Sequence, residues 1–213
     1  MHTDQLVNIL AHGAGTAPRR TGWRAMGLPL AGATALALAG GMAVLGAVPA
    51  SDFATPAPWM KLAYTGLLAW TLGLAALHAG LPAHPWRGPL RAAGIVFLLM
   101  AALGFGVWSQ APAAQQAATV LGRDGSWVTC APKVMLLALP VFAAAVAALR
   151  QLAPTRLRAT GALAGAAAGA CGALAYSFCC PESSAAYVAV WYTAGIAACA
   201  AAGALLGPRL LRW

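Results

Sequence analysis

Six long apolar stretches run through the chain, separated by short segments that carry most of the polar and charged residues. They cover approximately residues 25–48, 59–81, 92–109, 128–149, 160–178 and 186–206. Because a helix rises about 1.5 Å per residue, about 20 apolar residues cross the hydrocarbon core of a bilayer. No charged residue occupies the central turns of these stretches, where charge is costly. The pattern predicts an all-α fold, a polytopic membrane protein with a bundle of six transmembrane helices.

The same pattern divides the chain into three parts. Residues 1–24 form a polar N-terminal tail with a short amphipathic helix, residues 25–206 the six-helix domain, and residues 207–213 a basic C-terminal tail. Lys61 and Lys133 lie near the ends of their stretches, and we expect their ammonium groups to extend to the lipid headgroups. Residues 48–51 also resemble a signal-peptidase site, but the first stretch is long enough to span and its polar leader is long for a signal peptide. We therefore expect it to be retained.

Composition excludes two other classes of protein. Hydrophobic residues make up 61% of the 213 residues and charged residues only 8%, whereas roughly a quarter of a typical soluble domain is charged. So few ionised groups exclude an ordinary water-soluble globule, and the high hydrophobicity excludes an intrinsically disordered chain.

The formal net charge of +9 indicates orientation and not a nucleic-acid partner. The basic residues form small groups between the apolar stretches, and no basic patch is formed. With the N-terminus inside, the tail, residues 82–91, residues 150–159 and the C-terminal tail hold ten of the thirteen basic residues. The positive-inside rule then predicts that both termini are cytoplasmic.

Small residues at four-residue spacing mark the last two stretches. The members are Gly161, Gly165 and Gly169 in the fifth stretch, and Gly195, Cys199, Gly203 and Gly207 in the sixth. Such stripes allow the close backbone approach on which helix packing in lipid depends. We expect tight packing within the bundle, with a substrate groove as the alternative. The sequence leaves open whether two copies of the chain dimerise through these faces.

Three cysteines lie at the outer ends of the predicted helices. Cys130 lies at the start of the fourth stretch, and Cys179 and Cys180 directly follow the fifth. All three are expected on the oxidising outer face of the membrane, where disulfides persist. Three readings stay open: a redox- or metal-responsive pair, a structural disulfide, or unpaired thiols. Cys130 can form a disulfide with either Cys179 or Cys180, whereas a disulfide between the adjacent Cys179 and Cys180 is strained. Spacing predicts no catalytic residues, cofactor or resident metal site.

The N-terminal tail is the sizeable polar segment where a soluble partner can be met. Thr3 can cap a short helix and Asp4 suits its positive end, while Leu6, Val7, Ile9 and Leu10 form an apolar face. A helix of about ten residues is marginal alone in water. We therefore expect it to be ordered by a groove on a partner protein or, as the alternative, by the membrane surface.

Several short motifs carry a family resemblance that runs nearly from end to end. They are Thr3-Asp4-Gln5-Leu6-Val7-Asn8-Ile9-Leu10, Pro18-Arg19-Arg20, Pro58-Trp59-Met60-Lys61-Leu62, Ser126-Trp127-Val128-Thr129-Cys130, Cys180-Pro181-Glu182-Ser183-Ser184, Trp191-Tyr192-Thr193 and Arg209-Leu210-Leu211-Arg212-Trp213. With these motifs the chain resembles the NrsF family of bacterial inner-membrane anti-sigma factors. The Cys-Pro-Glu and Trp-Tyr pieces are the specific part.

The resemblance implies a function that composition and spacing do not. It implies that the cytoplasmic tail, with Thr3, Asp4, Leu6, Val7, Ile9 and Leu10, holds an extracytoplasmic-function sigma factor at the bilayer. It also implies release by a periplasmic metal or oxidative stress acting on outer cysteines, which fall on Cys130 and Cys180. Cys179 occupies a place where relatives are expected to carry histidine, which leaves the pairing ambiguous.

Two other classes compete with a regulator. A membrane oxidoreductase that passes electrons from thiols to a quinone would normally use a Cys-x-x-Cys unit, but the outer thiols include only an adjacent pair. A small transporter would normally place ionisable groups at mid-membrane depth, where this sequence has none. We expect a regulator with no enzymatic activity.

Overall fold

The computed structural model describes Thr3, Gln5, Val7, Asn8 and residues 22–212, except positions 82, 83, 123, 124 and 153. Six long apolar helical spans make up most of this part of the chain. The long helices are α2 (Gly22–Leu45), α3 (Pro56–Gly80), α4 (Arg87–Gln110), α6 (Ser126–Arg150), α7 (Leu157–Ser177) and α9 (Thr193–Leu210). No strand occurs among the described residues. The predicted all-α class and the count of six long apolar helices are confirmed.

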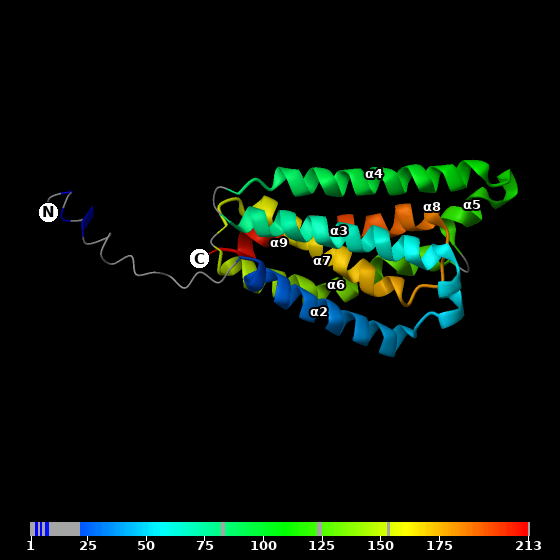
Figure 1. Ribbon diagram of the computed structural model, residues 1–213, viewed down its shortest axis with the longest axis horizontal. Helices are drawn as coiled ribbons and strands as arrows, with labels where there is room; N and C mark the ends of the chain where they lie inside the picture. Colours follow the sequence, from blue (N-terminus) through cyan, green and yellow to red (C-terminus); the bar gives the residue numbers. More distant parts are fainter. Residues whose placement is uncertain are drawn as a thin grey trace.

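Four short elements connect or extend the long helices. They are the 3-10 turn η1 (Ala50–Ala54), the helix α5 (Ala113–Leu121), the helical turn α8 (Ala185–Tyr187) and the π-helical turn η2 (Val188–Tyr192). All four are located at the same end of the bundle, and α8 and η2 run continuously into α9 (Figure 1). The sixth apolar span therefore covers Ala185–Leu210.

Helix boundaries differ from those that hydropathy indicates. Helix α4 begins at Arg87, five residues before the apolar stretch, because an arginine in the first turns can direct its guanidinium to water while its backbone stays helical. Helix α3 begins at Pro56, where a proline suits the first turn because its missing N–H would have no partner. Helix α5 lies in a segment for which hydropathy predicts only a loop.

The six helices run alternately up and down, so both α2 and α9 meet the same end of the bundle (Figure 1). Helix α7 lies in the centre and packs most extensively against α9, followed by α3 and α6. Its sequence makes this position possible, because alanine and glycine at most of its positions let the neighbouring backbones approach on every side. Nearly all of α7 is buried.

Glycines hold α7 and α9 at short range. A Cβ atom added at Gly161 or Gly203 would overlap a carbonyl oxygen of the facing helix, and one at Gly165 would overlap the carbonyl oxygen of Cys199. Gly169 lies against Cys199 and Ile196, and Gly207 against Leu157 and Gly161. Gly195 differs from the rest of its stripe because it packs against Val134 of α6.

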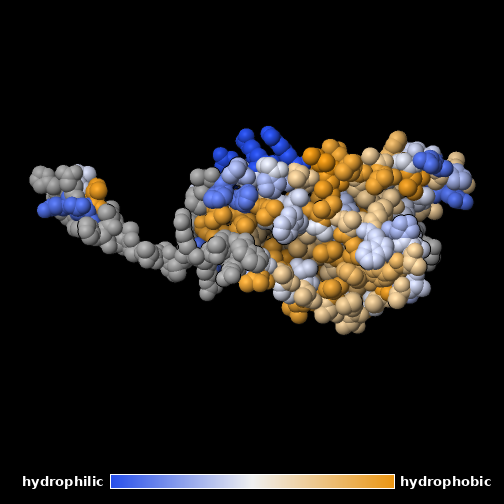
Figure 2. Space-filling view, viewed as in Figure 1, coloured by the Kyte–Doolittle hydropathy of each residue, from blue (hydrophilic) through white to orange (hydrophobic). Residues whose placement is uncertain are grey.

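The outer helices expose wide apolar faces. Leu36 of α2, Leu98 and Phe105 of α4 and Leu136 of α6 are each more than half exposed, and apolar residues cover much of the visible surface (Figure 2). Contiguous apolar surface of this extent is rare on a monomeric soluble protein. By length and composition, all six helical spans can cross a membrane.

Candidate functional site

A buried polar cluster lies where α3 and α6 begin and α7 ends. Its members come from α3, α6, the loop after α7, and the turns α8 and η2. They are Lys61, Ser126, Cys130, Tyr176, Cys180, Glu182, Tyr187 and Tyr192. Most of these side chains are nearly or fully buried, so the cluster is the main concentration of polar side chains inside the described part of the bundle.

Lys61 is at the centre of the contacts between α3 and the Cys-Pro-Glu loop. Its side chain is 2% exposed, and its Nζ donates hydrogen bonds to the carbonyl oxygens of Cys180, at 2.7 Å, and Glu182, at 2.9 Å. The expectation that Lys61 extends to the headgroups was therefore wrong. Two backbone carbonyls inside the protein satisfy the ammonium, which removes the need to reach water.

The carboxylate of Glu182 ties the same loop to α6. Its Oε1 accepts a hydrogen bond from the Ser126 hydroxyl at 3.1 Å, and the carboxylate interacts electrostatically with the Lys61 ammonium. Lys133 of α6 lies beside the end of α7, where its Nζ is 5.9 Å from the centre of the Tyr176 ring. The loop is therefore held by α3 and α6 together.

Cys130 and Cys180 belong to this cluster. Both are buried, at 0% and 1% exposure, and both are free thiols in the structure. Their side chains are close enough to interact electrostatically, because the hydrogen bonds of Lys61 draw the loop inward over the start of α6. The two cysteines that the resemblance singled out are thus brought together.

Cys179 points to a different neighbour. Its Sγ lies beside Gly41 of α2 and approaches the carbonyl oxygen of Ala175, one turn back along the chain, at 3.9 Å. Burial raises the pKa of the Cys179 thiol, and the adjacent Cys180 raises it further. This thiol is therefore protonated at neutral pH and faces away from the polar cluster.

Two tyrosines complete the cluster and have unusual environments. The hydroxyl groups of Tyr187 and Tyr192 are buried, and neither has a hydrogen-bond partner in the described part of the chain. Tyr187 lies near Ser126 and Cys130, and Tyr192 near Cys180. The π-helical turn between them places residues five apart on a similar side of the helix, so both rings enter the cluster.

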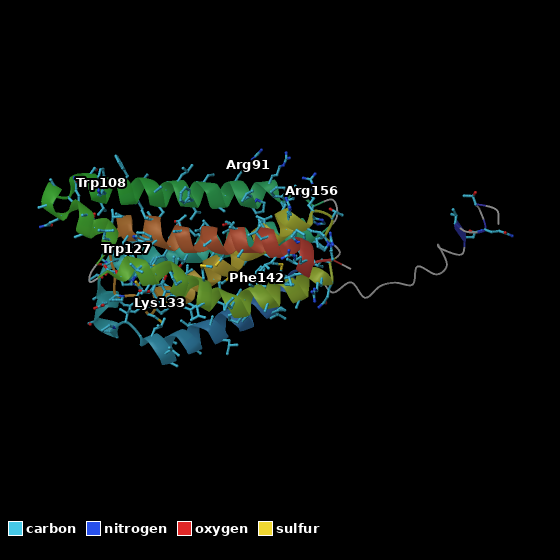
Figure 3. The ribbon with its side chains drawn as sticks, turned by 180° about the vertical axis from the view of Figure 1, so that it is seen from behind. Arg91, Trp108, Trp127, Lys133, Phe142 and Arg156 are labelled. Carbon is cyan, nitrogen blue, oxygen red and sulfur yellow. The ribbon has the colours of Figure 1, made fainter. Side chains whose placement is uncertain are left out.

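Helix α5 covers the cluster through contacts with α8 and η2. The Ser184 hydroxyl donates to the carbonyl oxygen of Thr119 at 2.7 Å, and the Trp191 indole N–H donates to that of Val120 at 2.8 Å. Trp127 stacks against Trp191 with ring centroids 5.1 Å apart, at the end of the bundle where Figure 3 shows Trp127 and Trp108. These contacts hold α5 in a segment for which hydropathy predicts a loop.

The other predicted site residues lie elsewhere. Thr3 and Val7 are described as helical, and Val7 is 58% exposed. Asp4, Leu6, Ile9 and Leu10 lie outside the described residues. Among the described side chains, no group of three or more His, Cys, Asp or Glu residues is placed to hold a metal ion.

Sequence reasoning missed Lys61 and the two tyrosines as parts of this site. The motifs around Lys61 and Tyr192 were visible in the sequence, but an apolar helix offers no signal for which polar residue turns inward.

The site thus combines buried thiols with one buried lysine at one end of a bundle of six apolar helices, each long enough to cross a membrane. Comparison with known proteins gives the family. Residues 10–213 match the family described as NrsF, Negative regulator of sigma F, and the chain belongs to this family.

Two curated relatives match over their full lengths. The chain is 35% identical over 217 residues to the Anti-sigma-F factor NrsF of Caulobacter vibrioides. It is 33% identical over 224 residues to the Probable anti-sigma-F factor NrsF of Azospira oryzae. All of this chain and all of each relative are covered. No solved structure matches the chain at a significant level.

Proposed function

We propose that this protein is an anti-sigma factor of the bacterial inner membrane that holds an extracytoplasmic-function sigma factor through its N-terminal tail. The family and the names of the two relatives support a sigma factor as the partner. Six apolar helices support a multi-pass position in the bilayer. The partner meets the apolar face predicted on residues 3–10, and the protein itself makes no contact with nucleic acid.

The distribution of charge supports cytoplasmic termini. Seven described arginines lie at the end of the bundle where α2 begins and α9 ends: Arg87, Arg91, Arg150, Arg156, Arg158, Arg209 and Arg212. Figure 3 shows Arg91 and Arg156 at that end, opposite Trp108 and Trp127. Positive residues are retained on the cytoplasmic side, so this end faces the cytoplasm and the polar cluster faces the periplasm.

The observation that carries the sensing proposal is the Cys180 loop, which lies over Cys130 and is held by Lys61. A two-electron oxidant such as a peroxide converts the two thiols to a disulfide and is itself reduced to water, taking up the two thiol protons. A disulfide requires Cα atoms within about 7 Å and a defined torsion, and we propose that adopting this geometry shifts the loop relative to α6. A soft metal cation bound by both thiolates would move the same loop.

This motion reaches the other end of the bundle through α3. Lys61 joins the loop to the second turn of α3, and α3 packs extensively against the central helix α7. A signal changes sigma affinity only if it favours one of two states. We propose that the reduced cluster favours the state that binds the sigma factor, and that the bridged cluster favours release.

Co-purification from detergent extract tests sigma capture. The full chain is expected to retain a sigma factor of the extracytoplasmic-function type, and a variant lacking residues 2–12 is expected to lose it. Sigma factor recovered equally with both proteins would contradict the tail as the binding site.

Cysteine substitution tests sensing. Cys130→Ser with Cys180→Ser is expected to abolish induction of the sigma regulon by oxidant or metal. Cys171→Ser with Cys199→Ser is the matched control, because these two thiols are also buried but lie within α7 and α9, away from the cluster. Normal induction in the first double variant would refute sensing at Cys130 and Cys180.

A further inference from the structure

A second polar cavity lies at the arginine-rich end of the bundle, far from the cysteines. Its volume is about 310 Å³, which is within the range of small-ligand pockets. It lies between the end of α3, the start of α4 and the start of α7. Thr160 and Ala79 form its floor, where the Thr160 hydroxyl donates to the Ala79 carbonyl oxygen at 3.2 Å.

The cavity is lined by positive and titratable side chains. Arg87 and Arg156 form its rim, and His78 and His84 lie along one wall with ring centroids 5.8 Å apart. No Asp or Glu lines it. The arginines are exposed at the rim, Ala79 is half-buried and Thr160 is fully buried, so an anion that enters the cavity meets positive charge on both sides and the protein interior below.

Backbone groups add to this positive potential. Helices α4 and α7 both begin at the cavity, and neither has an acidic residue in its first turn. The leading N–H groups of a helix lack intrahelical partners and attract anions. His78 Nδ1 lies 3.2 Å from the Pro85 carbonyl oxygen. Because a carbonyl oxygen only accepts hydrogen bonds, Nδ1 is the donor in this contact, and Nε2 is the ring nitrogen that the contact does not use.

We infer that this cavity, which we call the basic pocket (His78, His84, Arg87, Arg156 and Thr160), binds a phosphate group. Arginine matches the oxygens of phosphate with two parallel donors, and Thr155 at the rim offers a further hydroxyl. Basic pockets between helices on the cytoplasmic side of a membrane suit the phosphates of anionic lipids.

The surface beside the basic pocket favours a phospholipid over free phosphate. Helix α4 begins at the pocket and then exposes Leu90, Ile95 and Leu98, and in Figure 2 apolar surface lies next to the hydrophilic end of the bundle. An acyl chain can follow this face while its phosphate stays between Arg87 and Arg156. This choice of source rests on the proposed position in the membrane.

Lipid binding by the purified full-length protein tests the inference. The apparent Kd for dioleoylphosphatidylglycerol is measured in detergent from the ligand-induced rise in Tm. Arg87→Ala with Arg156→Ala is expected to weaken binding about 30-fold, as two basic groups near a membrane phosphate would predict. Arg91→Ala with Arg158→Ala removes the same charge near the starts of α4 and α7 but from residues that do not line the pocket, and is expected to weaken binding less than about threefold.

Two further ligands distinguish the sources. Dioleoylphosphatidylcholine is expected to leave Tm unchanged, because its choline group neutralises the phosphate. Inorganic phosphate that raises Tm as much as the anionic lipid, in an Arg87- and Arg156-dependent way, would support a phosphate site and assign it to a soluble ligand. Equal losses in both double variants, or no rise in Tm with either phosphate ligand, would overturn the inference. The assay contains no sigma factor, so its outcome is independent of sigma capture.

Discussion

The contacts of Lys61 predict how strongly the Cys-Pro-Glu loop is held. In Lys61→Met the loop loses two hydrogen bonds from a buried ammonium, to the carbonyl oxygens of Cys180 and Glu182. Hydrogen bonds to charged groups contribute about 1.5–3 kcal/mol each. The lower end of that range applies, because the substitution also removes the desolvation cost of the ammonium. We expect local opening of the loop to become about 3 kcal/mol easier, which is roughly a 100-fold larger open population.

Thiol labelling measures this opening directly. Cys180 is 1% exposed, so a maleimide reaches it mainly through local opening, and its labelling rate follows the open population. Mass spectrometry of digested protein assigns the label to Cys180. We expect the rate in Lys61→Met to rise roughly 100-fold.

Lys133→Met is the matched control. Lys133 is a lysine at the same end of the bundle, but its nearest described aromatic contact is the Tyr176 ring, with Nζ 5.9 Å from the centroid. Such a contact contributes about 0.5–1 kcal/mol, which limits the change in labelling to about fivefold. A rate in Lys61→Met within that same limit would refute the idea that Lys61 holds the loop.

Three further predictions concern packing, buried hydroxyls and a thiol. Gly165→Ala should lower stability by about 1–3 kcal/mol because its Cβ would overlap the Cys199 carbonyl oxygen. Gly73→Ala, which has open space around it, should raise stability by up to about 1 kcal/mol. Equal melting temperatures of the two variants in detergent would contradict this packing. Tyr187→Phe should leave stability unchanged or raise it, since the Tyr187 hydroxyl has no described hydrogen-bond partner. Tyr64→Phe should lower stability by about 1 kcal/mol because it loses a 2.7 Å hydrogen bond with Thr193. An equal loss of stability in both variants would show that the Tyr187 hydroxyl is hydrogen-bonded. Burial raises the pKa of the Cys179 thiol, so its maleimide labelling should keep rising to a higher pH than that of free cysteine, and coincident pH profiles would contradict the burial.

Hydropathy alone predicted the main framework of the fold. Charge-free apolar runs are long enough to cross a bilayer, and each of the six became a long helix. The stripes of small residues also indicated close packing, and the structure places Gly161 and Gly165 against the backbone of α9. These features follow from local composition and helical period, which the sequence displays directly.

The polar cluster needed three-dimensional information. A lysine near a helix end satisfies the same hydropathy pattern whether it reaches headgroups or turns inward, and only the carbonyls of Cys180 and Glu182, more than a hundred residues away in the chain, decide between the two. Helix α5 was missed for a similar reason, because its contacts come from Ser184 and Trp191. The choice between Cys179 and Cys180 likewise depends on which side of the loop faces α6.

The central claim is that thiols at one end of the bundle control sigma binding at the other. The most direct measurement is the amount of sigma factor that co-purifies with the full-length protein from intact cells before and after exposure to a peroxide. The account predicts that the wild-type protein loses its sigma factor after exposure and that Cys130→Ser with Cys180→Ser retains it. Equal loss of sigma factor from both proteins, or full retention by the wild type, would contradict the account.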